Sequence, residues 1–200
     1  MEGFIFFWFT WSTWIFSTFI LNKKNPYRFP LALISLITMI LSAYSVQFFQ
    51  YRISYASLFL WMISFAAFTN LSFSSLLNKS FRILIMTIAV ATFHILSLID
   101  PVWLIFEKTW MQAGSFAFLA ILLFSHLKDR IFAVINSFFQ GEFIYAALLQ
   151  RRSIDYPIGS LSFFDSLVLG LLFTSIWSGV EYLRHSFQHH ESKGRERPFI

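Results

Sequence analysis

The 200-residue chain contains no cysteine, only seven glycines and five prolines, and few charged residues, which make up 12% of the sequence. Without cysteine it can form neither a disulfide nor a thiolate metal site. A soluble domain typically carries about twice this share of charged residues. The sequence also lacks a glycine-rich phosphate loop and the G-x-S-x-G motif of many hydrolases. These absences exclude several common classes of soluble enzyme.

The residues that are abundant suit a lipid environment. Apolar residues make up 57% of the chain, the mean hydropathy is +0.65, and phenylalanine alone contributes 28 residues. Rings in such number would cause aggregation on a water-facing surface but are tolerated against lipid. The net charge is +5, but the cations lie between apolar stretches and at the C-terminus rather than along one face. We therefore expect a bilayer, and no nucleic acid, as the partner.

Seven apolar stretches predict an all-α, polytopic membrane helix bundle of about seven transmembrane helices, because about 20 apolar residues cross the hydrocarbon core. The polar segment Asn78–Ser80 is predicted to be a turn, and Asp100-Pro101 a helix end. The sixth stretch contains Asn136, Gln140 and Glu142, so whether it spans fully stays open. The predicted helices are Phe4–Leu21, Pro30–Phe49, Tyr55–Leu77, Phe81–Ile99, Met111–Leu127, Ile131–Leu149 and Leu161–Leu183.

The distribution of cations predicts the orientation. With seven spans, four of the 15 lysines and arginines lie on one side: Arg52, Lys108, Arg151 and Arg152. The other eleven lie on the opposite side: Lys23, Lys24, Arg28, Lys79, Arg82, Lys128, Arg130, Arg184, Lys193, Arg195 and Arg197. Because cytoplasmic loops are enriched in cations, this asymmetry predicts an N-terminus outside and a C-terminus inside.

This layout divides the chain into a transmembrane bundle over residues 1–183 and a basic, histidine-containing cytoplasmic tail over residues 184–200. The tail is expected to contact anionic lipid headgroups. Three residues at four-residue spacing, Glu181, His185 and His189, would share a helical face if the last helix continued, and two histidines so spaced can bind a divalent metal. A solvated tail without metal is the simpler interpretation, and we expect no cofactor.

Small residues recur every four positions on the last two predicted helices. Because apolar burial does not drive helices together in lipid, such residues allow the close backbone approach that does. The two stripes could face each other, and ordinary bundle packing is the simplest role for them. The positions are Ser137 and Gly141 on the sixth helix and Ser166, Gly170, Thr174 and Ser178 on the seventh.

Ionisable residues within apolar stretches are costly, so each is a functional candidate. His94 and Glu142 lie at about the same depth, roughly 16 Å from the inner ends of their helices, and could form a proton-exchanging pair. They could equally be structural groups that fix helix register. Asp165 lies about one turn from the outer surface, where it could sit among the lipid headgroups, cap its own helix, or line a shallow cavity with Gln47 and Gln112.

Two segments resemble a known family: the opening Met1–Trp11 (MEGFIFFWFTW) and the loop Asn22–Arg28 (NKKNPYR). In them the chain is similar to the YphA family of small Bacillus-type membrane proteins. The resemblance implies a multi-pass protein of the bacterial plasma membrane without established enzymatic activity, with envelope or spore assembly among the roles it suggests. It implies no functional residues.

Two functions remain open from the sequence. The first is a non-enzymatic scaffold or accessory factor that binds membrane-protein partners, which the lack of any reaction-specific constellation favours. The second is a small transporter or proton-coupled carrier that uses His94, Glu142 and Asp165. An intramembrane enzyme would need a ligand cluster or a nucleophile–base pair, and the sequence contains neither.

Overall fold

The apolar stretches form seven helices in the computed structural model, which describes residues 2–65 and 72–195, with side chains described through Arg184. A three-stranded sheet, in the order β1-β2-β3, joins them at one end. The strands are β1 Ser45–Phe48, β2 Tyr51–Ser54 and β3 Pro157–Ile158. The helices are α1 Phe4–Ile15 with a π-helical continuation η1 Phe16–Ile20, α2 Arg28–Leu41, α3 Tyr55–Phe65, α4 Phe73–Ile99, α5 Lys108–Leu123, α6 Leu127–Gln150 and α7 Leu161–Arg195.

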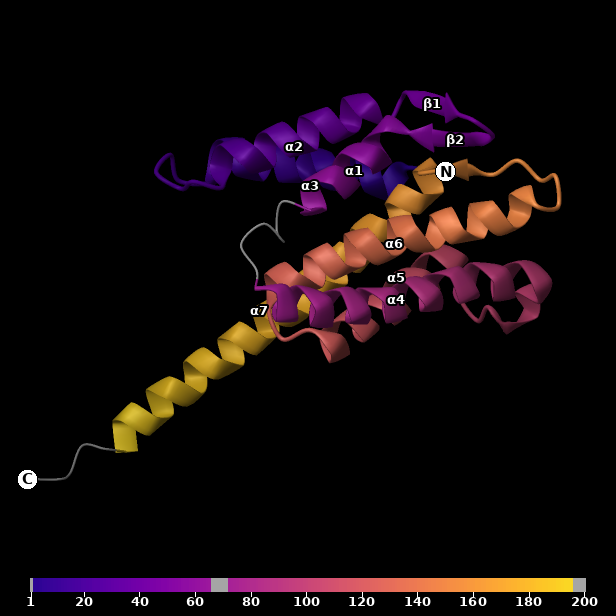
Figure 1. Ribbon diagram of the computed structural model, residues 1–200. Helices are drawn as coiled ribbons and strands as arrows, with labels where there is room; N and C mark the ends of the chain where they lie inside the picture. Colours follow the sequence, from indigo (N-terminus) through magenta and orange to yellow (C-terminus); the bar gives the residue numbers. More distant parts are fainter. Residues whose placement is uncertain (1, 66–71, 196–200) are drawn as a thin grey trace, which may run out of the picture.

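The helices are arranged in layers around α6 and α7 (Figure 1). One side is covered by α1, α2, α3 and the β1–β2 hairpin, and the other by α4 and α5. The main pairings are α4 with α6 and α5 with α7, while α1 also packs on α7 and α3 on α6. We call the end that carries the sheet and the N-terminus the hairpin end. The opposite end is the Arg130 end.

Three of the described helices are long and apolar enough to cross a membrane: α4, α6 and α7, the last over Leu161–Arg184. The predicted sixth span is therefore long enough despite its polar residues. The first three apolar helices are shorter, since Arg28–Leu41, for example, has 14 residues and a length of about 21 Å. The helical membrane class is confirmed, while the crossing of seven helices stays a prediction.

The second predicted helix, Pro30–Phe49, is too long, because the structure ends α2 at Leu41 and forms a hairpin from β1 and β2. Within residues 45–54, apolar and polar side chains alternate: Val46 and Ile53 pair across the strands, as do Gln47 and Arg52. A period of two suits a strand with two different faces rather than a helix. β3 then pairs in parallel with β2.

The predicted turn at Asn78–Ser80 is also wrong, because α4 runs through it from Phe73. No glycine or proline interrupts Phe73–Ile99, and Lys79 forms an ion pair of 2.7 Å with Asp129 that accommodates its charge at the helix surface. The third predicted helix, Tyr55–Leu77, corresponds to α3 and the first turn of α4. Its residues 66–71 lie outside the described residues.

The core is built largely from aromatic rings on α1, α4, α5, α6 and α7. The rings of Phe6 and Phe164 stack with centroids 4.8 Å apart, while Phe116 meets Phe138 edge-on at 5.6 Å. Offset stacks and edge-to-face contacts are the favourable geometries for such pairs. Many other large apolar side chains, among them Trp8 and Phe118, face outward, as expected of a surface in contact with lipid.

Candidate functional site: buried polar groups of the bundle

Asp165 holds the start of α1 rather than capping its own helix. Its Oδ2 accepts a hydrogen bond of 2.7 Å from the backbone N–H of Gly3, and its Oδ1 one of 2.8 Å from that of Phe6. The carboxylate is buried, and Gly3, with φ of 84°, provides no side-chain cap. Unsatisfied N–H groups at a helix start favour a carboxylate. Asp165 therefore supplies the cap that α1 lacks.

Glu142 is fully buried on α6 and binds the loop between α6 and α7. Its Oε1 accepts from the Tyr156 hydroxyl at 2.9 Å and its Oε2 from the Gly159 N–H at 3.0 Å. Burial, and then the adjacent carboxylate, raise the pKa of the Tyr156 phenol, so the hydroxyl stays protonated and donates. Gly159 has φ of 75°, and a Cβ there would lie 2.5 Å from Ser57 Oγ, so only glycine fits.

His94 does not contact Glu142. Among the described residues its Nε2 lies 3.1 Å from the Gln112 amide nitrogen, and its ring stacks on Tyr145 with centroids 5.1 Å apart. With the amide donating, the imidazole proton lies on Nδ1, which has no hydrogen-bond partner in the described part of the chain. Tyr145 meets Tyr156 edge-on at 5.0 Å, which connects His94 to Glu142 through two rings. We call Gln112, His94, Tyr145, Tyr156 and Glu142 the polar array.

The predicted outer cavity of Asp165, Gln47 and Gln112 is not formed. Gln112 binds His94, and Gln47 lines a small polar pocket on the hairpin with Arg52 and Asp155. Lys108, half-buried at the start of α5, acts electrostatically on both His94 and Glu142. Asp165 thus has contacts of its own at the start of α1, while His94 and Glu142 belong to the polar array without touching each other.

A buried arginine at the other end was missed by the sequence analysis. Arg130 is only 3% exposed. Its Nε donates to the Phe124 carbonyl at 2.7 Å, and one terminal nitrogen donates at 2.7 Å to both Ser178 and Glu181. One side chain thereby caps the end of α5 and ties α6 to α7. The sequence showed only a cation between two apolar stretches, with no sign of these partners.

Two further cations serve the same structural purpose. Arg82 donates to the Leu123 carbonyl at 2.6 Å and lies over the Phe124 ring at 5.9 Å. Arg28 donates to the carbonyls of Ser17 and Thr18 in η1. The last carbonyls of a helix lack partners within it, and arginine can satisfy them. Cations that the sequence presents as topology signals are thus also helix caps.

The small residues lie at close contacts, but the two stripes do not face each other throughout. A Cβ on Gly141 would lie 2.6 Å from Val90, so this glycine faces α4. Gly170 faces α6 and α5, with the nearest atoms at 3.6 to 3.8 Å. The hydroxyl residues of the stripes are bound locally: Ser137 donates to Val134, Ser166 to Ser162 and Thr174 to Gly170, while Ser178 accepts from Arg130.

The predicted metal site falls largely outside the described side chains. The α7 backbone is helical through Arg195, but the side chains of His185 and His189 lie outside the described residues. Glu181 is bound to Arg130 and to the Trp177 indole at 2.7 Å. Among the described residues no group of three potential ligands is placed to hold a metal. Metal binding by Glu181, His185 and His189 stays a prediction.

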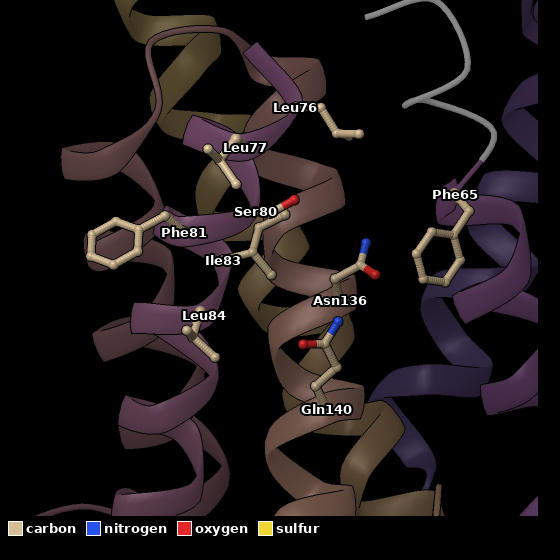
Figure 2. A pocket seen from close by; sticks show the side chains of 9 residues that line it. All are labelled: Phe65, Leu76, Leu77, Ser80, Phe81, Ile83, Leu84, Asn136 and Gln140. Atoms are coloured by element: carbon tan, nitrogen blue, oxygen red, sulfur yellow. The ribbon is translucent and has the colours of Figure 1, made fainter. Parts of the chain in front are cut away.

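Two apolar cavities lie between α6 and its neighbours. Figure 2 shows the first, of about 780 Å³, where Asn136 of α6 lies between Phe65 of α3 and Ile83 of α4. Asn136 donates to Ser64 at 2.8 Å and so joins α6 to α3. The second cavity, of about 700 Å³, shares Leu84 and Gln140 with the first and continues beneath the apolar face of the hairpin.

Comparison with known proteins gives a family but no characterised relative. One protein family, described as YphA-like integral membrane protein, matches residues 2–198, nearly the whole chain. No curated protein and no solved structure matches the chain.

Proposed function

We propose a function from the premise that the chain belongs to the family of YphA-like integral membrane proteins. This membership confirms the resemblance seen in its sequence. The proposed function is that of a non-enzymatic scaffold or accessory factor of the bacterial plasma membrane. Its partners would be other membrane proteins, with anionic headgroups at the basic tail. Envelope or spore assembly is the process that the resemblance suggests.

One observation carries this proposal: the buried acids are used to hold the chain together. Glu142 accepts two hydrogen bonds from the loop before α7, and Asp165 accepts two from the start of α1. A catalytic carboxylate has to reach a substrate proton or a reacting atom. These carboxylates are instead closed off by the loop before α7 and by the start of α1. Such a bundle is better suited to presenting surfaces than to chemistry.

A second candidate is a proton-coupled carrier, and one feature favours it. The polar array places a fully buried carboxylate and an imidazole, whose Nδ1 has no partner among the described residues, in one connected set of side chains. Intramembrane ionisable groups of this kind mark proton relays in pumps and transporters. A carrier would have to break the Glu142–Gly159 bond to open a path to the carboxylate.

We also propose the topology of seven spans with the N-terminus outside. The distribution of side chains supports it: Lys79, Arg82 and Arg130 gather at the Arg130 end, while Gly3 and the hairpin lie at the other. An open sheet edge is unfavourable in hydrocarbon, which favours a hairpin at the membrane surface. The short α2 would then be extended to the surface by β1.

Reporter fusions test this topology. We expect an alkaline phosphatase fused before Met1 to be active outside the cytoplasm and a fluorescent protein fused after Ile200 to be active inside it. The cation asymmetry gives the physical reason. The exchanged pair of fusions serves as the control and should be inactive at both ends. Both termini reporting from one compartment would contradict an odd number of spans.

Crosslinking in intact cells tests the scaffold function. We expect the full chain to co-purify with a membrane protein in a fixed ratio, and a chain lacking residues 184–200 to lose it while still inserting into the membrane. The control is a chain with Lys193, Arg195 and Arg197 changed to glutamine, which keeps the tail length. Recovery of the protein without any partner would count against a scaffold.

A flux measurement in reconstituted vesicles tests the carrier. Proton flux through the wild-type protein that is lost in the Glu142→Gln variant would favour this second candidate.

A further inference from the structure

The apolar face of the hairpin forms the wall of a groove that opens sideways on the bundle. The groove measures about 700 Å³, within the range of small-molecule sites. Val46, Phe48, Tyr51 and Ile53 line it from the hairpin, opposite Leu84 of α4. Its floor is α6, where the Gln140 side-chain oxygen accepts a hydrogen bond of 3.3 Å from the Thr87 hydroxyl of α4. The walls are almost entirely apolar.

Three exposed arginines lie on the hairpin and directly after α6, close to this groove but outside its lining. The hairpin turn meets the end of α6, because Gln150 donates to Gln50 at 3.3 Å. Arg151 and Arg152 follow at once and are exposed, as is Arg52 on the polar face of the hairpin. Among the described residues none of these three arginines forms an ion pair, and Asp155 is the one acid beside Arg52 in its pocket. The hairpin turn and the end of α6, which we call the rim, therefore carry a net positive charge.

We propose that the groove binds one acyl chain of an anionic phospholipid, with the lipid phosphate held at Arg52, Arg151 and Arg152. The hairpin explains how both parts are recognised, because its strands turn apolar residues toward the groove and Gln47 and Arg52 the other way. Phe49, 88% exposed at the tip, lies where the chain would pass from the groove to the headgroup.

The size of the groove argues against a protein occupant. A spanning helix about 30 Å long and 10 Å wide occupies on the order of 2,400 Å³. That is several times the volume of the groove, whereas a single flexible hydrocarbon chain follows a narrow apolar path. Arginine also matches a phosphate group through paired hydrogen bonds.

Native mass spectrometry of the purified protein with phosphatidylglycerol or phosphatidylcholine tests the proposal. We expect the wild type to retain one phosphatidylglycerol. Leu84→Trp should lower its occupancy roughly tenfold, since the indole displaces several buried methylenes. Leu122→Trp, at an exposed position on α5 away from the groove, is the matched control and should bind normally.

A second variant addresses the headgroup independently of the groove. R52Q/R151Q/R152Q should lose the preference for phosphatidylglycerol over phosphatidylcholine while keeping the chain in the groove, and K23Q/K24Q should retain the preference. Thermal unfolding in detergent identifies any variant that fails to fold. Equal binding by the Leu84→Trp and Leu122→Trp proteins, or an unchanged preference in the arginine variant, would overturn the proposal. So would a wild type that retains no phospholipid.

Discussion

Changing Gly141 to alanine is expected to destabilise the bundle by about 3 kcal/mol, the upper range for overpacking a tight core. The added Cβ would lie 2.6 Å from two atoms of Val90 and 3.1 Å from the Thr87 carbonyl. Val90 is fully buried, so neither it nor the α4 backbone can move aside without separating α4 from α6. Thermal unfolding in detergent micelles measures the loss.

The control for this prediction is Gly114→Ala on α5, where a Cβ meets nothing within 4 Å. It should be neutral or stabilise by up to about 1 kcal/mol, because alanine favours a helix more than glycine does. In a V90G background the cost of G141A should fall sharply, since both Val90 atoms are gone and the Thr87 carbonyl at 3.1 Å is the contact that stays. Equal unfolding temperatures for G141A and G114A would show that α4 and α6 are not in close contact.

Changing Arg130 to methionine is expected to cost about 3 kcal/mol, the lower range for breaking a buried ion pair. The lower end of the range applies because the Glu181 side chain is already 36% exposed, so water can solvate its carboxylate once the arginine is removed. The Phe124 carbonyl and the Ser178 hydroxyl lose their charged donor, and α6 loses its tie to α7. The effect is measured as the free energy of unfolding in mixed micelles.

Lys128→Met provides the comparison, because Lys128 is exposed two positions away and should tolerate the change. Arg130→Lys keeps the charge but cannot reach Phe124, Ser178 and Glu181 together, so an intermediate loss is expected. If the methionine variants of Arg130 and Lys128 were equally stable, the contacts of Arg130 would have no energetic role.

Composition predicted the class of this protein because hydropathy averages over many residues. Polar residues and proline that interrupt the apolar pattern also located the end of α4 near Asp100 and the start of α7 at Leu161, whereas α7 runs on to Arg195, beyond the predicted end at Leu183. The hairpin was missed because an apolar run of this length suits a membrane helix as well as a strand. The signals for strands were short: Val46 and Phe48 alternate with Gln47 in β1, and Tyr51 and Ile53 alternate with Arg52 in β2.

The buried polar groups show more clearly what cannot be predicted from the sequence. Glu142 and Asp165 stand out in the sequence because charge is rare in apolar stretches. Their backbone partners, the N–H groups of Gly3, Phe6 and Gly159, do not stand out, because every residue except proline has a backbone N–H. Arg130 was counted as a loop cation because a charged residue at a helix end reveals the side of the membrane, not whether the side chain is buried.

The bond between Asp165 and Gly3 joins residues 162 positions apart and has a consequence for biosynthesis. The nascent polypeptide emerges from the ribosome N-terminus first, so α1 leaves the translocon long before its acceptor has been made. Its first N–H groups must stay hydrated at the membrane surface until translation is nearly complete. Contact between the last helix and the first therefore forms only late in synthesis. A prematurely terminated product without α7 would have a frayed, protease-sensitive N-terminal end of α1.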